Sequence, residues 1–125
     1  MDQKPFSITE RIKSFTPALN GLKWFLKNEH NVRVHLFLSI VSILGGIFFQ
    51  ISINEWIAII ICIGMVLALE AANSAIERLV DLVSPEKNQL AGLVKDLAAG
   101  AVLIASLISV IIAAVIFYPK INHLF

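Results

Sequence analysis

The fold is decided by the stretch WIAIIICIGMVLALEAANSAIERLVDLV, residues 56–83, in which acidic side chains interrupt an apolar run. The uncharged part, Trp56 to Leu69, is 14 residues long. That is about 21 Å of helix, whereas the hydrocarbon core of a bilayer is about 30 Å thick. A membrane-spanning helix here must therefore continue past Glu70. If it runs to about Ile76, Glu70 lies about 9 Å inside the apolar edge, where an ionisable group is costly and usually functional.

Two longer uncharged segments flank this stretch. Val34 to Asn54 is 21 residues without Lys, Arg, Asp or Glu, and Leu97 to Pro119 is 23 such residues. Each is long enough to cross a bilayer as a helix. The chain is therefore expected to be an all-α membrane protein, a single domain over residues 1–125. The predicted transmembrane helices cover about 32–52, 55–83 and 86–118.

Prolines set the boundaries of the third predicted span. Ser84 and Pro85 are typical of the cap and first turn of a new helix, which would run on into the apolar segment. Pro119 is expected to end that helix near the far membrane surface.

Residues 7–28 are predicted to form an amphipathic surface helix. Ser7 followed by Glu10 fits a capping box, and Pro17 is expected to kink or divide the helix. Its opposite face is basic, which suits an anionic membrane surface, but packing against the chain's own bundle would explain the pattern equally well. The apolar positions are Ile8, Ile12, Phe15, Leu19, Leu22 and Leu26.

Composition excludes several classes of protein. The 125 residues are 58% hydrophobic and 15% charged, which excludes most water-soluble enzymes. The net charge of +1 provides no basic field for nucleic acid. Cys62 has no second cysteine to pair with. Small residues on the second and third spans allow the helices to approach each other closely. Because three helices alone bury little polar surface, the chain is expected to form a homo-oligomer.

The distribution of basic residues predicts the topology. Lys and Arg are absent from the link at residues 50–55, whereas they precede the first span and flank the second connection. The positive-inside rule therefore places the N-terminus and the second connection in the cytoplasm. The basic residues concerned are Lys4, Arg11, Lys13, Lys23, Lys27, Arg33, Arg78, Lys87 and Lys95.

Four polar side chains share one stripe of the central helix. With Glu70 at 0°, Asn73, Glu77 and Asp81 lie at about 300°, 340° and 20°. Buried carboxylates need a partner or a proton, so a functional site is favoured over a hydrogen-bonded seam between helices.

Other charged residues are placed to complete such a site. Lys95 and Asp96 lie at a similar depth if the helices are antiparallel, although such a pair is more often a helix-end anchor. Glu29 and Arg33 have the spacing of a surface ion pair. Glu29 and Glu77 are alternatively a natural pair of oxygen ligands for Mg²⁺, which usually binds substrate phosphates as well.

Familiar metal and nucleotide motifs are missing. His30, His35 and His123 lack helical metal spacing, so zinc is not expected, and His35 is placed to orient Asn31 one turn away. The glycines match neither a Walker loop nor a dinucleotide fingerprint.

The run EAANSAIE at residues 70–77, followed by Asp81, together with Lys95-Asp96 and AAGAVL at residues 98–103, resembles the prokaryotic diacylglycerol kinase family. Arg11, Gly21-Leu22 and Asn28-Glu29 also match that family's surface helix and metal-site carboxylate, so the resemblance covers nearly the whole chain.

The resemblance implies a homotrimeric lipid kinase of the bacterial cytoplasmic (inner) membrane, with ATP as co-substrate, Mg²⁺ as cofactor and cytoplasmic-facing sites shared between subunits. Glu70 would be the base for the lipid hydroxyl, and Glu29 and Glu77 would hold Mg²⁺ and the nucleotide. Arg11, Glu86, Lys95 and Asp96 would also contact the nucleotide. Asn73, Asp81, Arg33 and Ala99 would support the site or bind the lipid substrate.

Two lipid alcohols compete as the substrate. The branch that phosphorylates undecaprenol is the more similar, ahead of the branch that phosphorylates diacylglycerol. The residues that favour it are Ala18, Leu19, Gly21, Leu22, Glu29, Asn31, Arg33 and His35.

Two other function classes fit a polar stripe in a membrane helix. In an oligomeric ion or proton channel the carboxylates would line a pore, but Val66, Ile63 and Ile59 continue the same face as apolar groups. In a structural adaptor the stripe would only join helices.

Overall fold

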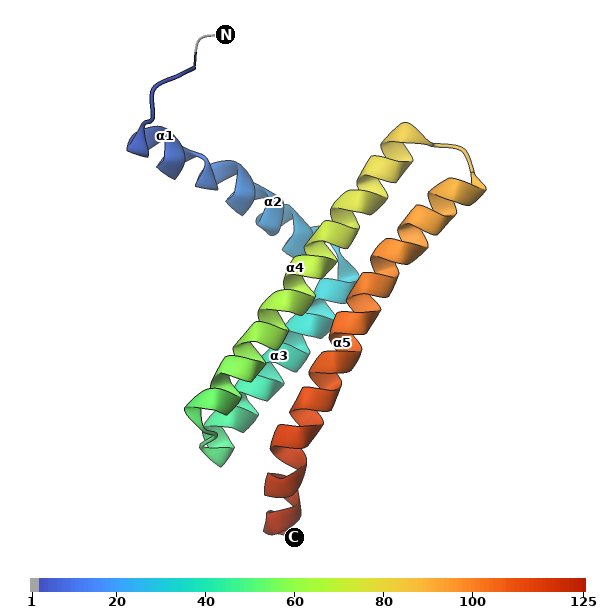
Figure 1. The fold of residues 1–125 in the computed structure, drawn as a ribbon. Helices are drawn as coiled ribbons and strands as arrows, with labels where there is room; N and C mark the ends of the chain where they lie inside the picture. The colour runs from blue at the N-terminus through green and yellow to red at the C-terminus, as the bar shows by residue number, and fades with distance from the viewer. Residues whose placement is uncertain (1–2) are drawn as a thin grey trace.

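The computed structural model describes residues 3–125, and the regular secondary structure in this part of the chain is all helical, without strands (Figure 1). Short connections separate the helices. In chain order these are α1 (Ile8–Lys13), α2 (Phe15–Asn28), α3 (His30–Phe49), α4 (Ile53–Val83) and α5 (Gln89–Leu124).

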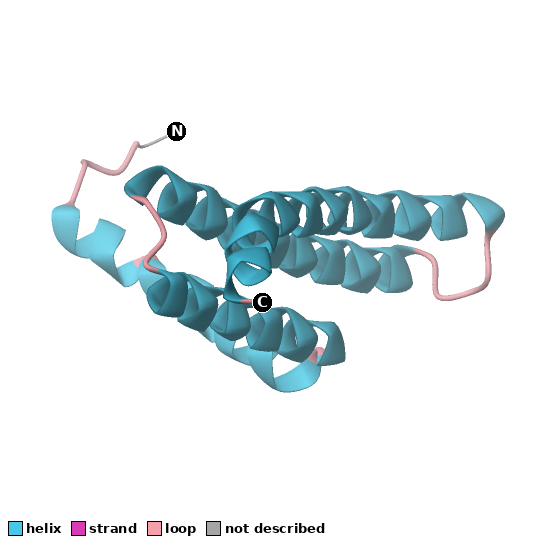
Figure 2. Ribbon diagram, turned by 90° about the horizontal axis from the view of Figure 1, so that it is seen from below, coloured by secondary structure: helices cyan, strands magenta, loops and turns pink. Residues whose placement is uncertain are grey.

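Helices α4 and α5 run antiparallel along most of their length, and α3 packs beside the half of α4 nearest the α3–α4 turn (Figures 1 and 2). The loop between α4 and α5 lies at one end of the bundle, and the α3–α4 turn and the C-terminus lie at the other (Figure 1). Helices α1 and α2 project away from the bundle. Helices α3, α4 and α5 are long and apolar enough to cross a membrane, as predicted.

The three long helices differ in length. Helix α3 has 20 residues, α4 has 31 and α5 has 36, which correspond to about 30, 46 and 54 Å. Helices α4 and α5 therefore extend well beyond a hydrocarbon core of about 30 Å. Few side chains in their apolar windows are buried within the chain, as suits a protein surrounded by lipid or by further subunits.

The turn between α3 and α4 is fixed by backbone and side-chain hydrogen bonds. Gln50 adopts the left-handed conformation with φ 50°, and the amide of Ile51 donates to the carbonyl of Gly46 at 3.1 Å. A capping box then begins α4: Glu55 N donates to Ser52 Oγ at 3.2 Å, and Ser52 N donates to Glu55 Oε1 at 3.1 Å. These bonds satisfy amides that a helix start leaves free.

Gly46→Ala should destabilise the bundle by about 1–3 kcal/mol, because overpacking displaces neighbouring side chains. A Cβ at Gly46 would lie 2.7 Å from the Trp56 ring and 3.0 Å from the Ile51 side chain. Thermal unfolding in detergent should show a lower midpoint. Gly64→Ala is the matched control, since a Cβ there meets nothing within 4 Å. Equal midpoints for the two variants would contradict the packing argument.

The N-terminal boundaries of two membrane helices differ from those predicted. Helix α5 begins at Gln89 and not near residue 86, because Asn88 Oδ1 accepts from the amides of Leu90 at 2.8 Å and Ala91 at 3.3 Å. Residues 84–88 thus form a loop. Helix α3 begins at His30, directly after the extended backbone of Glu29, and ends at Phe49.

Pro119 does not end the third membrane helix, contrary to prediction. Helix α5 continues through it to Leu124. Proline removes the backbone donor that would bond to the carbonyl of Val115. One residue later, Lys120 Nζ donates to the carbonyl of Ile116 at 3.1 Å and to Glu55 Oε2 at 2.6 Å. This side chain ties the last turns of α5 to the start of α4.

The predicted surface helix is divided into α1 and α2 at Ser14. Pro17 lies in the first turn of α2, where its missing amide and its ring act against a continuous helix through Lys13. Ser7 Oγ accepts from Glu10 N at 3.4 Å and caps α1. The predicted apolar positions are all exposed, and Phe25 is buried instead. Most of the stripe therefore lies away from this chain's own bundle, and only Leu22 lines a hollow against α4.

Candidate functional site

Glu70 is buried between α3 and α4, with 7% of its surface exposed. Its Oε1 lies 2.9 Å from Nε2 of His35 on α3. The carboxylate therefore has a hydrogen-bond partner on a neighbouring helix, as a buried charge requires. The sequence pattern predicted that His35 orients Asn31, one turn away on the same helix. The structure gives His35 a different partner, 35 positions away in the chain.

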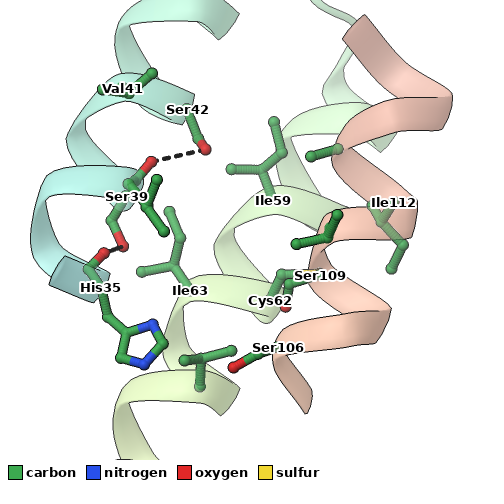
Figure 3. A pocket seen from close by; sticks show the side chains of 14 residues that line it. His35, Ser39, Val41, Ser42, Ile59, Cys62, Ile63, Ser106, Ser109 and Ile112 are labelled. Carbon is green, nitrogen blue, oxygen red and sulfur yellow. Dashed lines mark hydrogen bonds between the residues drawn. The ribbon is translucent and has the colours of Figure 1, made fainter. Parts of the chain in front are cut away.

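A cavity of about 260 Å³ begins at His35 and extends between α3, α4 and α5 (Figure 3). Most of its lining is aliphatic. Three of the serines that line it donate to backbone carbonyls of their own helices: Ser39 to His35, Ser42 to Leu38, and Ser109 to Ala105. Because these three hydroxyls are satisfied, the cavity offers a mostly aliphatic surface next to the His35 ring.

Glu29 lies in the break between α2 and α3, where its backbone is extended (φ −97°, ψ 122°). Its Oε1 accepts from Ser74 Oγ at 2.6 Å and from Arg78 at 3.0 Å. Ser74 is buried one turn after Glu70 on α4. These bonds hold the Glu29 carboxylate beside the polar stripe of α4.

The predicted Glu29–Arg33 ion pair is wrong. The Arg33 guanidinium donates to the carbonyl of Lys27 at 3.1 Å. Glu29 pairs instead with Arg78, whose guanidinium lies 5.0 Å from the centre of the Trp24 ring. Arg78 thus joins α2, the start of α3 and α4 through one side chain.

Asn73 and Glu77 form the other part of the stripe. Asn73 Nδ2 donates to Glu77 Oε1 at 3.3 Å, and Asn73 Oδ1 is buried without a partner in the described chain. Within residues 3–125, no group of three or more His, Cys, Asp or Glu side chains is arranged to hold a metal. The available ligands are all oxygens, and Mg²⁺ usually needs only one or two carboxylates besides substrate phosphates. Glu29, Glu77 and the unpartnered Asn73 oxygen match that donor chemistry, but no hydrogen bond in the described chain joins Glu29 to Glu77, and Glu29 is paired with Ser74 and Arg78.

A polar hollow of about 470 Å³ lies at the end of α4 and α5. Asp81, Glu86 and Lys95 line it, and Lys95 Nζ donates to Asp81 Oδ1 at 2.6 Å. The structure thus brings these three predicted site residues together at the α4–α5 loop.

The remaining predicted residues contact neither the polar stripe of α4 nor the polar hollow at the α4–α5 loop within this chain. Asp96 and Ala99 are exposed on α5, and Arg11 of α1 lies 5.5 Å from the centre of the Phe6 ring.

Sequence reasoning missed three residues of the site. Ser74 lies about 40° from Glu70 on the helix and belongs to the same stripe, so the periodicity contained that signal. His35 and Arg78 contact the site only through helix packing, which spacing along one helix does not reveal.

The chain is similar to proteins of one family over most of its length. Residues 16–117 match the family described as "Prokaryotic diacylglycerol kinase". The undecaprenol kinase of Bacillus subtilis is 39% identical over 108 residues, which is 86% of this chain and 88% of the relative. The diacylglycerol kinase of Haemophilus influenzae is 33% identical over 116 residues, 92% of this chain and 98% of that protein.

The diacylglycerol kinase of Escherichia coli K12 is 29% identical over 103 residues, 82% of this chain and 84% of the relative. The matches thus extend over α2 to α5, including Glu70, its partner His35 and the polar hollow. The family acts on alcohols, with a nucleoside triphosphate as the phosphate donor expected of a kinase. From this similarity and the three apolar helices, we conclude that the chain is a multi-pass membrane phosphotransferase that belongs to the prokaryotic diacylglycerol kinase family.

Proposed function

We propose that this protein transfers the γ-phosphate of ATP to the primary hydroxyl of a membrane lipid alcohol, with undecaprenol preferred over diacylglycerol. The observation that carries the proposal is the buried Glu70 carboxylate, whose hydrogen-bond partner His35 lines an apolar cavity. A lipid chain in that cavity would bring its hydroxyl from the bilayer toward Glu70. The phosphate donor, a nucleoside triphosphate, would approach from water at the α4–α5 end of the bundle.

Glu70 acts as the general base in this mechanism. It accepts the hydroxyl proton while the lipid oxygen forms a bond to the γ-phosphorus and the bond to the bridging oxygen of ADP breaks. The apolar surroundings exclude water that would compete as the acceptor. The role of the chain is mainly to place donor and acceptor in line and to neutralise charge.

Glu29, Glu77 and the Asn73 carbonyl oxygen would hold Mg²⁺. When bound, this ion neutralises charge on the triphosphate. Ser74 positions the Glu29 carboxylate by its 2.6 Å hydrogen bond. Asn73 positions Glu77 in the same way through its amide nitrogen.

Lys95 and Glu86 would contact the nucleotide in the polar hollow, with Asp81 holding Lys95 in place. Arg11 and Asp96 complete the nucleotide site when a second subunit covers the exposed faces of the bundle. Arg33 and Ala99 contact the lipid substrate. The enzyme is a homotrimer in this proposal, with sites shared between subunits.

The site faces the cytoplasm of a bacterium, at the inner membrane, in this proposal. Supporting this orientation, Arg78, Lys87 and Lys95 lie at the α4–α5 end, whereas residues 50–55 at the opposite turn contain no Lys or Arg. ATP is available on that side. The channel alternative is disfavoured because the same helix continues with Val66 and Ile59, which are buried and apolar.

Undecaprenol is favoured because the Bacillus relative named for that substrate shares 39% of aligned residues, against 33% and 29% for the two diacylglycerol kinases. Both lipids present a primary hydroxyl, so the preference of the enzyme between them depends on how their hydrocarbon tails fit. The apolar cavity accepts a hydrocarbon without a polar linkage near the hydroxyl.

A competition assay tests the proposal. Purified protein in mixed micelles receives ATP labelled in the γ-phosphate, Mg²⁺ and equal amounts of undecaprenol and diacylglycerol. We expect label in both lipids, with more in undecaprenyl phosphate. Label chiefly in phosphatidic acid would reverse the substrate preference, and label in neither lipid would reject the lipid kinase assignment for these alcohols.

A further inference from the structure

We infer that His35, which lines one end of the apolar cavity, is a positioning residue that holds Glu70, the proposed base, in its orientation. This inference rests on the proposed function, in which Glu70 takes the proton of the lipid hydroxyl. It assigns a role to a side chain that the mechanism above leaves unused.

The geometry of the pair comes from two different helices. His35 Nε2 and Glu70 Oε1 are 2.9 Å apart, and the exposed fractions of the two side chains are 20% and 9%. In the described part of the chain, no other group hydrogen-bonds the Glu70 carboxylate. Its orientation therefore depends on this one contact between α3 and α4.

His35 is itself held in place and lines the cavity. Its backbone carbonyl accepts from Ser39 Oγ at 2.6 Å, and its ring lies at one end of the apolar space (Figure 3). Glu70 does not line this space itself, and the His35 ring lies between the cavity lining and the carboxylate that it contacts at 2.9 Å. The pair thus marks the boundary between the lipid cavity and the polar stripe.

The chemistry of the contact explains why a donor is needed there. An ionised carboxylate only accepts hydrogen bonds, so Nε2 of His35 is the donor in this contact. The bond occupies Oε1 and leaves Oε2 without a described protein partner, available to accept a proton from the substrate. A buried carboxylate without any donor would be strongly destabilised, and it would turn away or become protonated. Either change removes the base.

Three variants test this role. His35→Leu removes the donor, His35→Gln retains an N–H at the end of a side chain of similar reach, and His123→Leu is the matched control at the exposed end of α5. We expect His35→Leu to lower kcat about 30-fold or more while the KM for lipid changes less than about 3-fold, because a positioned base contributes about 10²–10⁴-fold. His35→Gln should stay within about 5-fold of wild type, and His123→Leu should be unchanged.

The inference is overturned if His35→Leu retains the wild-type kcat, or if His35→Gln loses as much as His35→Leu. A purely packing role would lower thermal stability in both variants without separating kcat from KM. If His35→Leu does not assemble, His35→Asn replaces it. Asn keeps a polar group but is too short to reach Glu70, so the same loss of kcat is expected and a wild-type kcat would reject the role.

The same preparations separate this inference from the proposed function. Wild-type protein that labels no lipid alcohol contradicts the proposed function itself. Wild-type protein that labels lipid and loses transfer on Glu70→Gln, together with a fully active His35→Leu, contradicts only the positioning role.

Discussion

Glu70→Gln should lower kcat for lipid phosphorylation by about 10³-fold, the loss expected when a general base is removed. Glutamine has nearly the same size, and its carbonyl oxygen still accepts the hydrogen bond that His35 donates to Glu70 at 2.9 Å. It does not accept a proton from an alcohol at neutral pH. The fold should therefore persist while transfer stops, as measured with γ-labelled ATP and lipid in mixed micelles.

Glu55→Gln is the matched control for this experiment. Glu55 lies on the same helix as Glu70, but near the α3–α4 turn, where its partner is Lys120 at 2.6 Å. This variant should keep transfer within a few-fold of wild type. A Glu70→Gln protein that assembles normally and still transfers phosphate at a comparable rate would mean that another group accepts the proton. In that case the buried position of Glu70 would serve helix packing only.

Glu77→Gln should reduce transfer by about 10²-fold at millimolar Mg²⁺, with partial recovery at higher Mg²⁺ concentrations. In the wild type, Asn73 Nδ2 donates to Glu77 Oε1 at 3.3 Å, and the amide oxygen of glutamine can accept the same hydrogen bond, so the local geometry is preserved. The ligand charge is lost, and carboxylate charge largely determines how tightly a hard cation is bound. Activity measured against free Mg²⁺ at saturating ATP should show a half-maximal concentration at least about 10-fold higher.

Glu10→Gln provides the corresponding control for the loss of one negative charge. Glu10 is exposed on α1, and the hydrogen bond that it makes with Ser7 uses the Glu10 backbone amide. The Mg²⁺ dependence of this variant should match wild type. An unchanged Mg²⁺ profile in Glu77→Gln would remove Glu77 from the metal site. Binding of Mn²⁺ to the two variants can be measured directly by electron paramagnetic resonance. This measurement distinguishes weaker metal binding from a slower chemical step.

The membrane architecture was predictable from segment lengths, because about 20 apolar residues are needed to cross a bilayer. The continuation of α4 past Glu70 followed from the shortness of its uncharged part. Helix ends were less predictable. The side chain of Asn88 caps the start of α5, and Lys120, just after Pro119, ties the last turns of α5 to Glu55 at the start of α4. Both effects depend on contacts that periodicity does not encode.

The polar stripe of α4 was predictable because helical spacing alone determines which residues share a face. Glu29 was expected near this stripe, and it lies against Ser74. Its partner Arg78 was not expected, because proximity in sequence favoured Arg33. The His35 contact was also missed, since it depends on how α3 rotates against α4. Spacing within one helix thus predicted which side chains belong to the site, whereas packing between helices determined which side chains they hydrogen-bond.

The unequal lengths of the membrane helices link the enzyme to the dimensions of its bilayer. Glu70 follows the start of α4 by 17 residues, or about 26 Å of helix, so its depth below the headgroups depends on where that helix start is anchored. In vesicles made from longer-chain phospholipids, the carboxylate would sink further from the aqueous triphosphate, and in shorter-chain vesicles it would rise into the interface. Phospholipid chain length should therefore have an optimum for turnover.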